Sequence, residues 1–126
     1  MSKVYDLLLS TLLTLFILSS CTEPNYEVSY YHDIQPIFNS RCIHCHGEYT
    51  QHHNLCLSNY DSLMAGNSYN GPVVDPDVKT EYNLLYQRIS NSEPTSSRMP
   101  LDGPPFLNQE QIDLIWRWIY NGAEDN

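Results

Sequence analysis

One five-residue stretch, Cys42-Ile43-His44-Cys45-His46, limits what this chain can fold into more than any other feature. Two cysteines separated by two residues and followed at once by histidine form the pattern for covalent attachment of a c-type haem. The spacing lets both thiols add to vinyl groups along one edge of a single porphyrin, and it places an imidazole where it can bind the iron. The motif therefore predicts one haem held by Cys42 and Cys45, with His46 as the proximal iron ligand.

Two other uses of paired cysteines agree less well with the surrounding residues. A thioredoxin-like dithiol is expected within a strand–helix–strand unit, which this sequence lacks, and it has no use for a histidine directly after it. A zinc finger needs a histidine pair about a dozen residues after the second cysteine, with the two histidines three to five residues apart. His52 and His53 come earlier and are adjacent. Haem attachment is therefore the favoured interpretation.

The start of the chain resembles an export signal. Lys3 precedes an apolar run over residues 7–18, which has the length of a signal-peptide core and is too short to span a bilayer. The run ends in the sequence LSSC at residues 18–21, which resembles the lipobox of bacterial lipoproteins. In that motif the cysteine, here Cys21, is acylated and becomes the new N-terminus. The alternative is ordinary cleavage after a small residue, which would leave Cys21 as a spare thiol.

These features predict the organisation of the whole chain. We expect a signal peptide over residues 1–20, a lipidated cysteine and tether over residues 21–28, and one domain over residues 29–126. The protein would then be anchored by lipid to a membrane of the bacterial cell envelope, on the periplasmic side or the outer surface. Removal of the leader leaves about 106 residues, which is enough for one small domain.

Charge and cysteine content exclude several classes of function. A formal net charge of −9 argues against a nucleic-acid partner and would steer proteins with a basic surface toward this one. Once Cys21 carries lipid and the motif carries haem, Cys56 is the one cysteine left over. A lone thiol cannot form a disulfide framework, so we expect Cys56 to be a small buried side chain.

Hydrophobic periodicity predicts an all-α domain of about four short helices, and no strand pairs are evident. The expected helices run from Ser29 or Asp33 past Pro36 into the haem motif, from Ser58 or Asn59 to Gly66, from Thr80 or Asn83 through Ile89, and from Asn108 to Gly122. The last of these is the best specified. Asn108 and Gln111 suit a capping box, Leu107 and Ile112 suit a hydrophobic staple, and Gly122 suits the helix stop.

A haem that transfers electrons quickly needs a second axial ligand. The candidates are Met64, Met99, His32, His52 and His53. Met99 is favoured, because a thioether is a soft ligand and this one lies about 50 residues after His46, before a proline-rich loop that can hold it still. Met64 fits a helical core pattern better. His52 and His53 lie in a polar run close to His46, so reaching the far side of a haem would strain the chain.

Three further stretches, DIQPIF at residues 33–38, LLYQRI at 84–89 and RMPL at 98–101, carry a family resemblance. With the haem motif they resemble class I monohaem cytochrome c, and most closely the Planctomycete-type cytochrome c domain, which also occurs in small bacterial lipoproteins. The similarity covers about residues 30–123. One departure is the segment 77–83, which looks longer than the usual connection and makes the start of the third helix uncertain.

The resemblance implies a class I cytochrome c fold, with short helices wrapped around one covalent haem c. By that resemblance Cys42 and Cys45 carry the haem, and His46 and Met99 are its axial ligands. The first and last helices would cross near Phe38 and Trp118. These two residues, with Arg88 and Arg98 from the matching stretches, are the candidate haem-pocket residues.

Three functions are compatible with such a domain: an electron carrier, a peroxidase-like haem enzyme, and a haem-based gas or redox sensor. An enzyme or a sensor needs an open or labile iron site, and a well-placed Met99 argues against both. A two-haem peroxidase would need a second CxxCH motif, and a sensor would need an output module, for which the mature domain has no room. We therefore expect a membrane-tethered carrier rather than an enzyme, with redox proteins as donor and acceptor and no small-molecule substrate.

Overall fold

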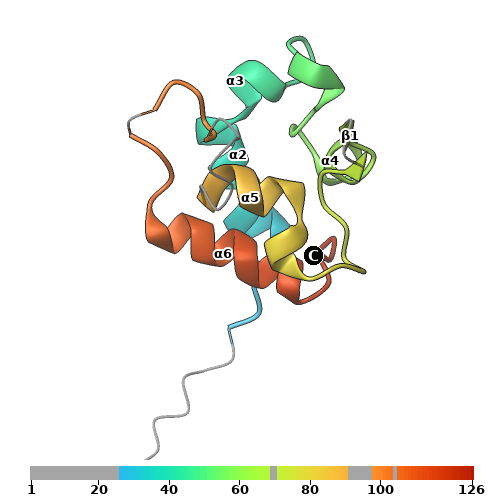
Figure 1. Ribbon diagram of the computed structural model, residues 1–126. Helices are drawn as coiled ribbons and strands as arrows, with labels where there is room; N and C mark the ends of the chain where they lie inside the picture. Colours follow the sequence, from blue (N-terminus) through green and yellow to red (C-terminus); the bar gives the residue numbers. More distant parts are fainter. Residues whose placement is uncertain (1–25, 69–70, 91–97, 104) are drawn as a thin grey trace, which may run out of the picture.

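The structure is a computed structural model that describes residues 26–68, 71–90, 98–103 and 105–126. Its elements, in chain order, are η1 (Tyr30–Ile34), α2 (Gln35–Arg41), α3 (Ile43–His46), η2 (His52–Asn54), α4 (Tyr60–Met64), β1 (Asn67–Ser68), β2 (Gly71–Pro72), η3 (Thr80–Tyr82), α5 (Leu84–Ser90) and α6 (Gln109–Tyr120). Short helices dominate, as Figure 1 shows, so the all-α prediction is confirmed. The predicted signal peptide and Cys21 lie outside the described residues.

A short antiparallel pair is the exception to the all-α pattern. Asn67 pairs with Pro72 and Ser68 pairs with Gly71. The expectation of no strand pairs is wrong here. The segment is rich in turn-forming residues rather than in the alternating apolar residues that signal a strand, so its pairing had no periodic signature.

The first predicted helix consists of η1 and α2, which meet between Ile34 and Gln35. Ser29 caps η1, where its side chain accepts a hydrogen bond of 3.2 Å from the N–H of His32. The N–H of Ile34 then reaches back five residues to the Ser29 carbonyl, at 3.3 Å. Pro36 lies in the first turn of α2, where the N–H that proline lacks has no helical partner to lose. Two short helical segments therefore replace one long one.

The second and third predicted helices begin at polar caps. Asn59 accepts a hydrogen bond of 2.8 Å from the N–H of Ser62 and starts α4. The long connection over residues 77–83 contains η3, and α5 follows it. A helix therefore begins at each of the two expected places, at Thr80 and directly after Asn83. Between η3 and α5, Asn83 is buried, and its side chain forms bonds of 2.6 and 3.1 Å to the main chain of Asp75. That amide ties the connection to the start of α5.

The last helix has the ends that the sequence predicts. Asn108 and Gln111 form a complete capping box, with hydrogen bonds of 2.9 and 3.0 Å. Gly122 follows the helix at φ 103°, and the N–H of Ala123 bonds the carbonyl of Trp118 at 2.9 Å, as in a Schellman motif. The hydrophobic face of α6 packs on η1 and α5.

The core is richest in aromatic rings where α6 meets η1. Tyr30 and Trp118 are buried, with exposed fractions of 0% and 1%. Their ring centroids are 5.4 Å apart. Tyr60 packs edge-on against both, at 5.1 Å from Tyr30 and 6.4 Å from Trp118. The polar groups of Trp118 and Tyr60 are both hydrogen-bonded. The Trp118 indole N–H donates to the Glu124 carbonyl, and the Tyr60 hydroxyl donates to the Ala123 carbonyl. This cluster stabilises the domain through contacts between buried rings.

Asn126 joins the last residues to the first described turn. Its side chain accepts from the N–H of Tyr30 at 2.7 Å and donates to the Val28 carbonyl at 3.4 Å. Its main-chain oxygen accepts from the Tyr31 N–H and the Ser29 hydroxyl. We call this set of bonds the tail clasp. It ties η1 to the end of α6 across nearly the whole sequence.

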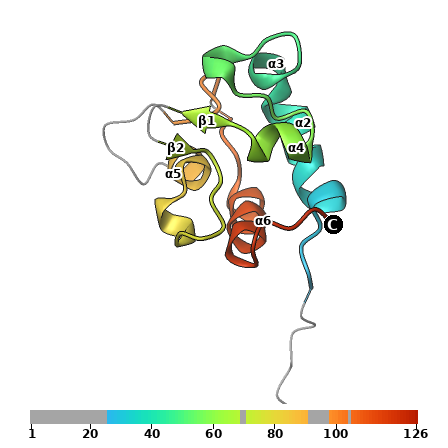
Figure 2. The same ribbon diagram turned by 90° about the vertical axis from the view of Figure 1, so that its right-hand side faces the viewer.

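The two ends of the domain differ in what they contain. In Figure 1 and Figure 2 alike, α3 lies at the top, and residues 26–28 leave the domain at the bottom. The haem motif and the start of the described chain therefore lie at opposite ends. Across the described ranges, no helix combines the length and the apolar character that crossing a bilayer requires.

Candidate functional site

The haem motif occupies the junction of α2 and α3. Cys42 ends α2, where its N–H bonds the Phe38 carbonyl at 2.8 Å, and its own carbonyl accepts from Cys45 and His46 at 3.1 and 2.9 Å. One helical turn therefore brings the two thiols and the imidazole together. Cys45 is exposed and Cys42 is half-buried against the core. Both sulfurs are free, as thioether formation requires.

Burial changes the chemistry expected of Cys42. Loss of hydration raises the pKa of its thiol to about 12, and the carboxylate of Asp102 acts in the same direction, while Arg41 opposes it. Such a thiol stays protonated at neutral pH, whereas the attacking cysteine of a redox dithiol needs a lowered pKa. The dithiol interpretation is therefore disfavoured by the structure.

His46 is half-buried, and burial lowers the pKa of its imidazole. Main-chain groups of His52 and Leu55 oppose that shift, but neither forms a hydrogen bond with the Nδ1 atom, which is buried without a partner. A neutral ring is the form that binds a metal, and an unpaired buried nitrogen is uncommon unless a further group uses the ring. Two free thiols and this imidazole together fit a covalent haem.

A zinc site is not formed by these side chains. Among the described residues, no three histidine, cysteine or carboxylate groups lie close enough together to hold a metal ion. A structural zinc ion needs four such ligands. The haem, by contrast, needs only one imidazole from this set.

The loop after the motif brings His52 beside His46. The two rings meet edge to face, with centroids 6.4 Å apart. The main chain folds back through a bridge between His46 and Gln51, and both His53 and Asn54 take left-handed φ values of 60° and 59°. Sequence reasoning missed this contact, because it considered His52 and His53 only as ligands that would have to reach the far side of a haem. His52 is thus the histidine to test against Met99.

Met99 lies in a loop that packs on the core. We call residues 98–103 and 105–107 the Met99 loop. The N–H of Met99 bonds the Arg88 carbonyl at 2.9 Å, and its half-buried side chain contacts the hydrophobic core. The Met99–Pro100 peptide is cis, and the N–H of Gly103 bonds the Pro100 carbonyl at 3.2 Å in a tight turn. The end of α5 therefore holds one side of this loop.

The other candidate haem-pocket residues have structural partners. Arg98 donates to the Ile89 carbonyl at 3.3 Å, and its guanidinium lies 4.4 Å from the centre of the Phe106 ring. Arg88 contributes its carbonyl to Met99. Phe38 and Trp118 are both buried in the protein core.

One side chain connects the Met99 loop to the motif. Arg41, the residue before Cys42, donates from Nη2 to the Pro105 carbonyl at 2.5 Å. The same nitrogen lies 3.9 Å from a carboxylate oxygen of Asp102. The structure thereby brings the loop that carries Met99 to the end of α2, next to the first cysteine of the motif.

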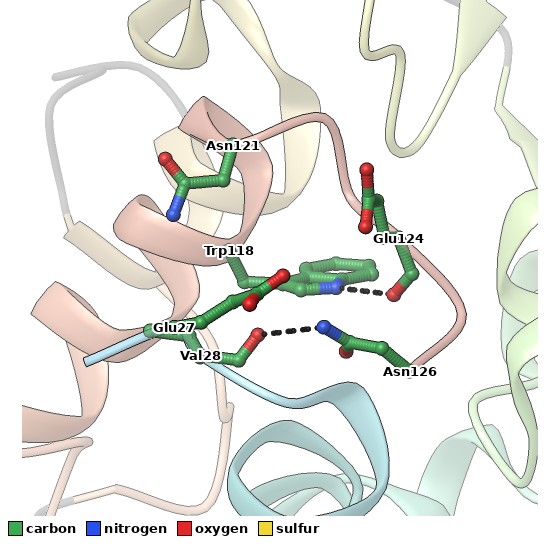
Figure 3. A pocket seen from close by; sticks show the side chains of 6 residues that line it. All are labelled: Glu27, Val28, Trp118, Asn121, Glu124 and Asn126. Atoms are coloured by element: carbon green, nitrogen blue, oxygen red, sulfur yellow. Dashed lines mark hydrogen bonds between the residues drawn. The ribbon is translucent and has the colours of Figure 1, made fainter. Parts of the chain in front are cut away.

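Figure 3 shows a pocket elsewhere on the molecule, lined by Glu27, Val28, Trp118, Asn121, Glu124 and Asn126. The indole N–H of Trp118 and the amide of Asn126 point toward it, but both are hydrogen-bonded to protein carbonyls. Of the candidate site residues, Trp118 lines it, but the candidate iron ligands do not. The pocket is therefore not the candidate site.

The chain was compared with known protein families and proteins. Residues 42–103 match the family described as Planctomycete cytochrome C, a range that begins at Cys42, the first cysteine of the motif, and includes Met99. The resemblance drawn from the motifs is thereby confirmed. No curated protein and no solved structure matches the chain.

Proposed function

We propose, from the match of residues 42–103 to the Planctomycete cytochrome C family, that this chain carries a cytochrome c domain and is a monohaem electron carrier of the bacterial cell envelope. The observation that carries the proposal is the α3 turn, which presents two free thiols and one neutral, half-buried imidazole. A c-type haem bound there supplies an iron that gains and loses one electron.

Each residue of the turn has a separate task. Cys42 and Cys45 would form the thioether bonds that keep the haem in place. His46 would bind the iron, and its burial keeps the imidazole neutral and therefore able to coordinate. Met99 would be the second iron ligand, because its side chain is half-buried in a loop that Arg41 links to the motif. Methionine with histidine favours a high reduction potential and leaves no open position for a substrate.

Replacement of Met99 tests this ligand set. Met99→Ala holoprotein should keep its haem, because the thioether bonds and His46 are untouched. It should lose the far-red absorption band of methionine-bound ferric haem, show a lower reduction potential, and bind carbon monoxide when reduced. Met64→Ala is the matched control, since Met64 is also half-buried against the core but lies on α4. The control should keep the band.

Histidine ligation gives a different result. If wild-type protein lacks the far-red band and His52→Ala, rather than Met99→Ala, opens the iron to carbon monoxide, His52 is the ligand and the carrier has a low potential. If wild-type reduced protein itself binds carbon monoxide readily, the iron site is open, and a peroxidase-like enzyme or a gas sensor replaces the carrier.

We extend the proposal to a lipid anchor at Cys21, supported by the apolar run and the LSSC sequence before it. Several acyl chains hold a protein firmly on a membrane, whereas a single chain does not. Cys21→Ser should therefore leave the precursor uncleaved or release the holoprotein from membranes. Cys56→Ser is the control, because Cys56 is buried in the folded domain. A Cys21→Ser protein that is processed and fractionates as wild type would refute the anchor.

Redox proteins with a basic surface are the proposed donor and acceptor, because this chain has a formal net charge of −9. Attraction between opposite charges raises the rate of encounter and weakens as salt screens it. The rate of electron exchange with a basic redox protein should fall as ionic strength rises. A rate that does not depend on salt would indicate an apolar docking surface instead.

A further inference from the structure

The two sides of the Met99 loop are held by different elements. On one side the main chain of α5 accepts hydrogen bonds from Met99 and Arg98. On the other side Arg41 donates to Pro105. Inside the loop, Gly103 lies so close to Phe106 that a Cβ at this position would be 2.5 Å from the ring. The loop is therefore compact, and its position against the motif depends on what joins it to α2.

Arg41 makes that connection with two contacts of unequal strength. The bond to the Pro105 carbonyl is short, and its donor carries a full charge, which strengthens a hydrogen bond. The contact to Asp102 is long, at 3.9 Å, and the Asp102 side chain is 76% exposed, whereas that of Arg41 is 26% exposed. Ion pairs to exposed carboxylates contribute little to stability. The bond to Pro105 is therefore the main link.

The position of Arg41 in the sequence gives this link a functional meaning. Arg41 is the last residue of α2 and precedes the cysteine that carries one thioether bond in the proposed function. Any movement of the loop away from Arg41 also moves Met99 relative to Cys42. The link thus spans the two segments from which the two axial ligands are proposed to come.

We propose that Arg41 is a positioning residue that holds the Met99 loop against the haem motif and so keeps Met99 on the iron. The inference rests on the proposed ligation by Met99. Loss of the bond to Pro105 increases the fraction of molecules in which Met99 has left the iron, while the haem stays attached and the core stays folded. Arg41 acts through the loop and is not itself proposed as an iron ligand.

The test compares four variants of the holoprotein. Arg41→Gln removes the charged donor, and we expect about a tenfold rise in the apparent affinity of the reduced protein for carbon monoxide, from the loss of one charge-assisted bond. The far-red band should weaken. Arg41→Lys, which keeps a cation of similar reach, should give an intermediate result. Asp102→Asn, which removes only the long ion pair, should behave as wild type.

Arg117→Gln is the matched control for charge. Arg117 loses the same unit of charge, but its side chain is exposed and donates to the Asp113 carbonyl within its own helix. Amide hydrogen exchange gives a readout that does not depend on the haem. Residues 98–103 should exchange faster in Arg41→Gln than in Arg117→Gln, while the denaturation midpoints of the two variants should agree.

The outcomes distinguish a failure of the role proposed for Arg41 from a failure of the proposed ligation by Met99. If Met99→Ala abolishes the far-red band but Arg41→Gln keeps both the band and the carbon monoxide affinity of wild type, Met99 is the ligand and the role of Arg41 is overturned. If wild-type protein lacks the band, the Met99 ligation and this inference fail together. If Arg41→Gln yields no holoprotein, Arg41→Lys provides the test. Carbon monoxide binding by Arg41→Lys that equals that of wild type would overturn the proposal.

Discussion

The two ends of this domain are built on different principles. At the aromatic end, which consists of Tyr30, Tyr60, Trp118 and the tail clasp, buried side chains contact one another and their polar atoms are paired. At the motif end, which consists of α3 and the Met99 loop, none of the four α3 side chains is buried. Main-chain hydrogen bonds and Arg41 hold this end in place. The protein thus stabilises itself at one end and presents its chemically distinctive side chains at the other.

The largest effect should come from the aromatic end. Trp118→Ala removes a buried ring that contacts two tyrosines and should lower the free energy of unfolding by about 3–5 kcal/mol. Trp116→Ala, on the same helix, removes a ring that stacks on exposed Tyr120 at 4.8 Å and should cost about 1 kcal/mol. Denaturant unfolding of both holoproteins, followed by far-UV circular dichroism, measures the difference. Equal losses would mean that the aromatic end does not dominate stability.

Two glycine-to-alanine variants should affect stability and the absorption band to different extents. Gly122 has φ 103° with free space around it, so Gly122→Ala should cost about 1 kcal/mol of stability through backbone strain alone and leave the far-red band unchanged. Gly103→Ala would push the Phe106 ring, which packs on Arg98, and should weaken the band with a smaller loss of stability. Thermal unfolding and absorption spectra of the two variants test this. The division into two ends fails if both variants change both properties alike.

A similarly small effect on stability should come from the tail clasp. Asn126→Ala removes the acceptor for the Tyr30 N–H and should cost about 1 kcal/mol, the usual value for a lost helix cap. For a domain of this size, that change lowers the unfolding temperature by about 4–8 °C. Asn121→Ala, at an exposed position after α6, is the control and should change it less. A tail clasp that contributes nothing would leave the two variants with the same unfolding temperature.

Local signals account for what the sequence could predict. The capping box of Asn108 with Gln111 and the stop at Gly122 depend on neighbours within one turn, and the structure confirms both. The haem motif is equally local, and its three key residues meet in one helical turn. Periodicity and caps are readable at this range without knowledge of the rest of the fold.

Long-range contacts could not be predicted in the same way. The bond of Asn126 to Tyr30 joins residues 96 positions apart, and that of Arg41 to Pro105 joins residues 64 positions apart. Neither leaves a pattern in a single sequence. The approach of His52 to His46 depends on two left-handed residues that ordinary turn signals do not indicate. The second axial ligand belongs to this class, because it depends on where a distant loop packs.

The tail clasp has a mechanical consequence. A pull on residues 26–28 is passed through Val28 and Tyr30 to Asn126 and the end of α6, since these residues are hydrogen-bonded to one another. The turn that bears Cys42, Cys45 and His46 lies at the far end of the domain from these bonds, as Figure 1 shows. We therefore expect a domain pulled by its N-terminal segment to open first at the clasp. The side chains of Cys42, Cys45 and His46 should keep their relative positions while the clasp opens.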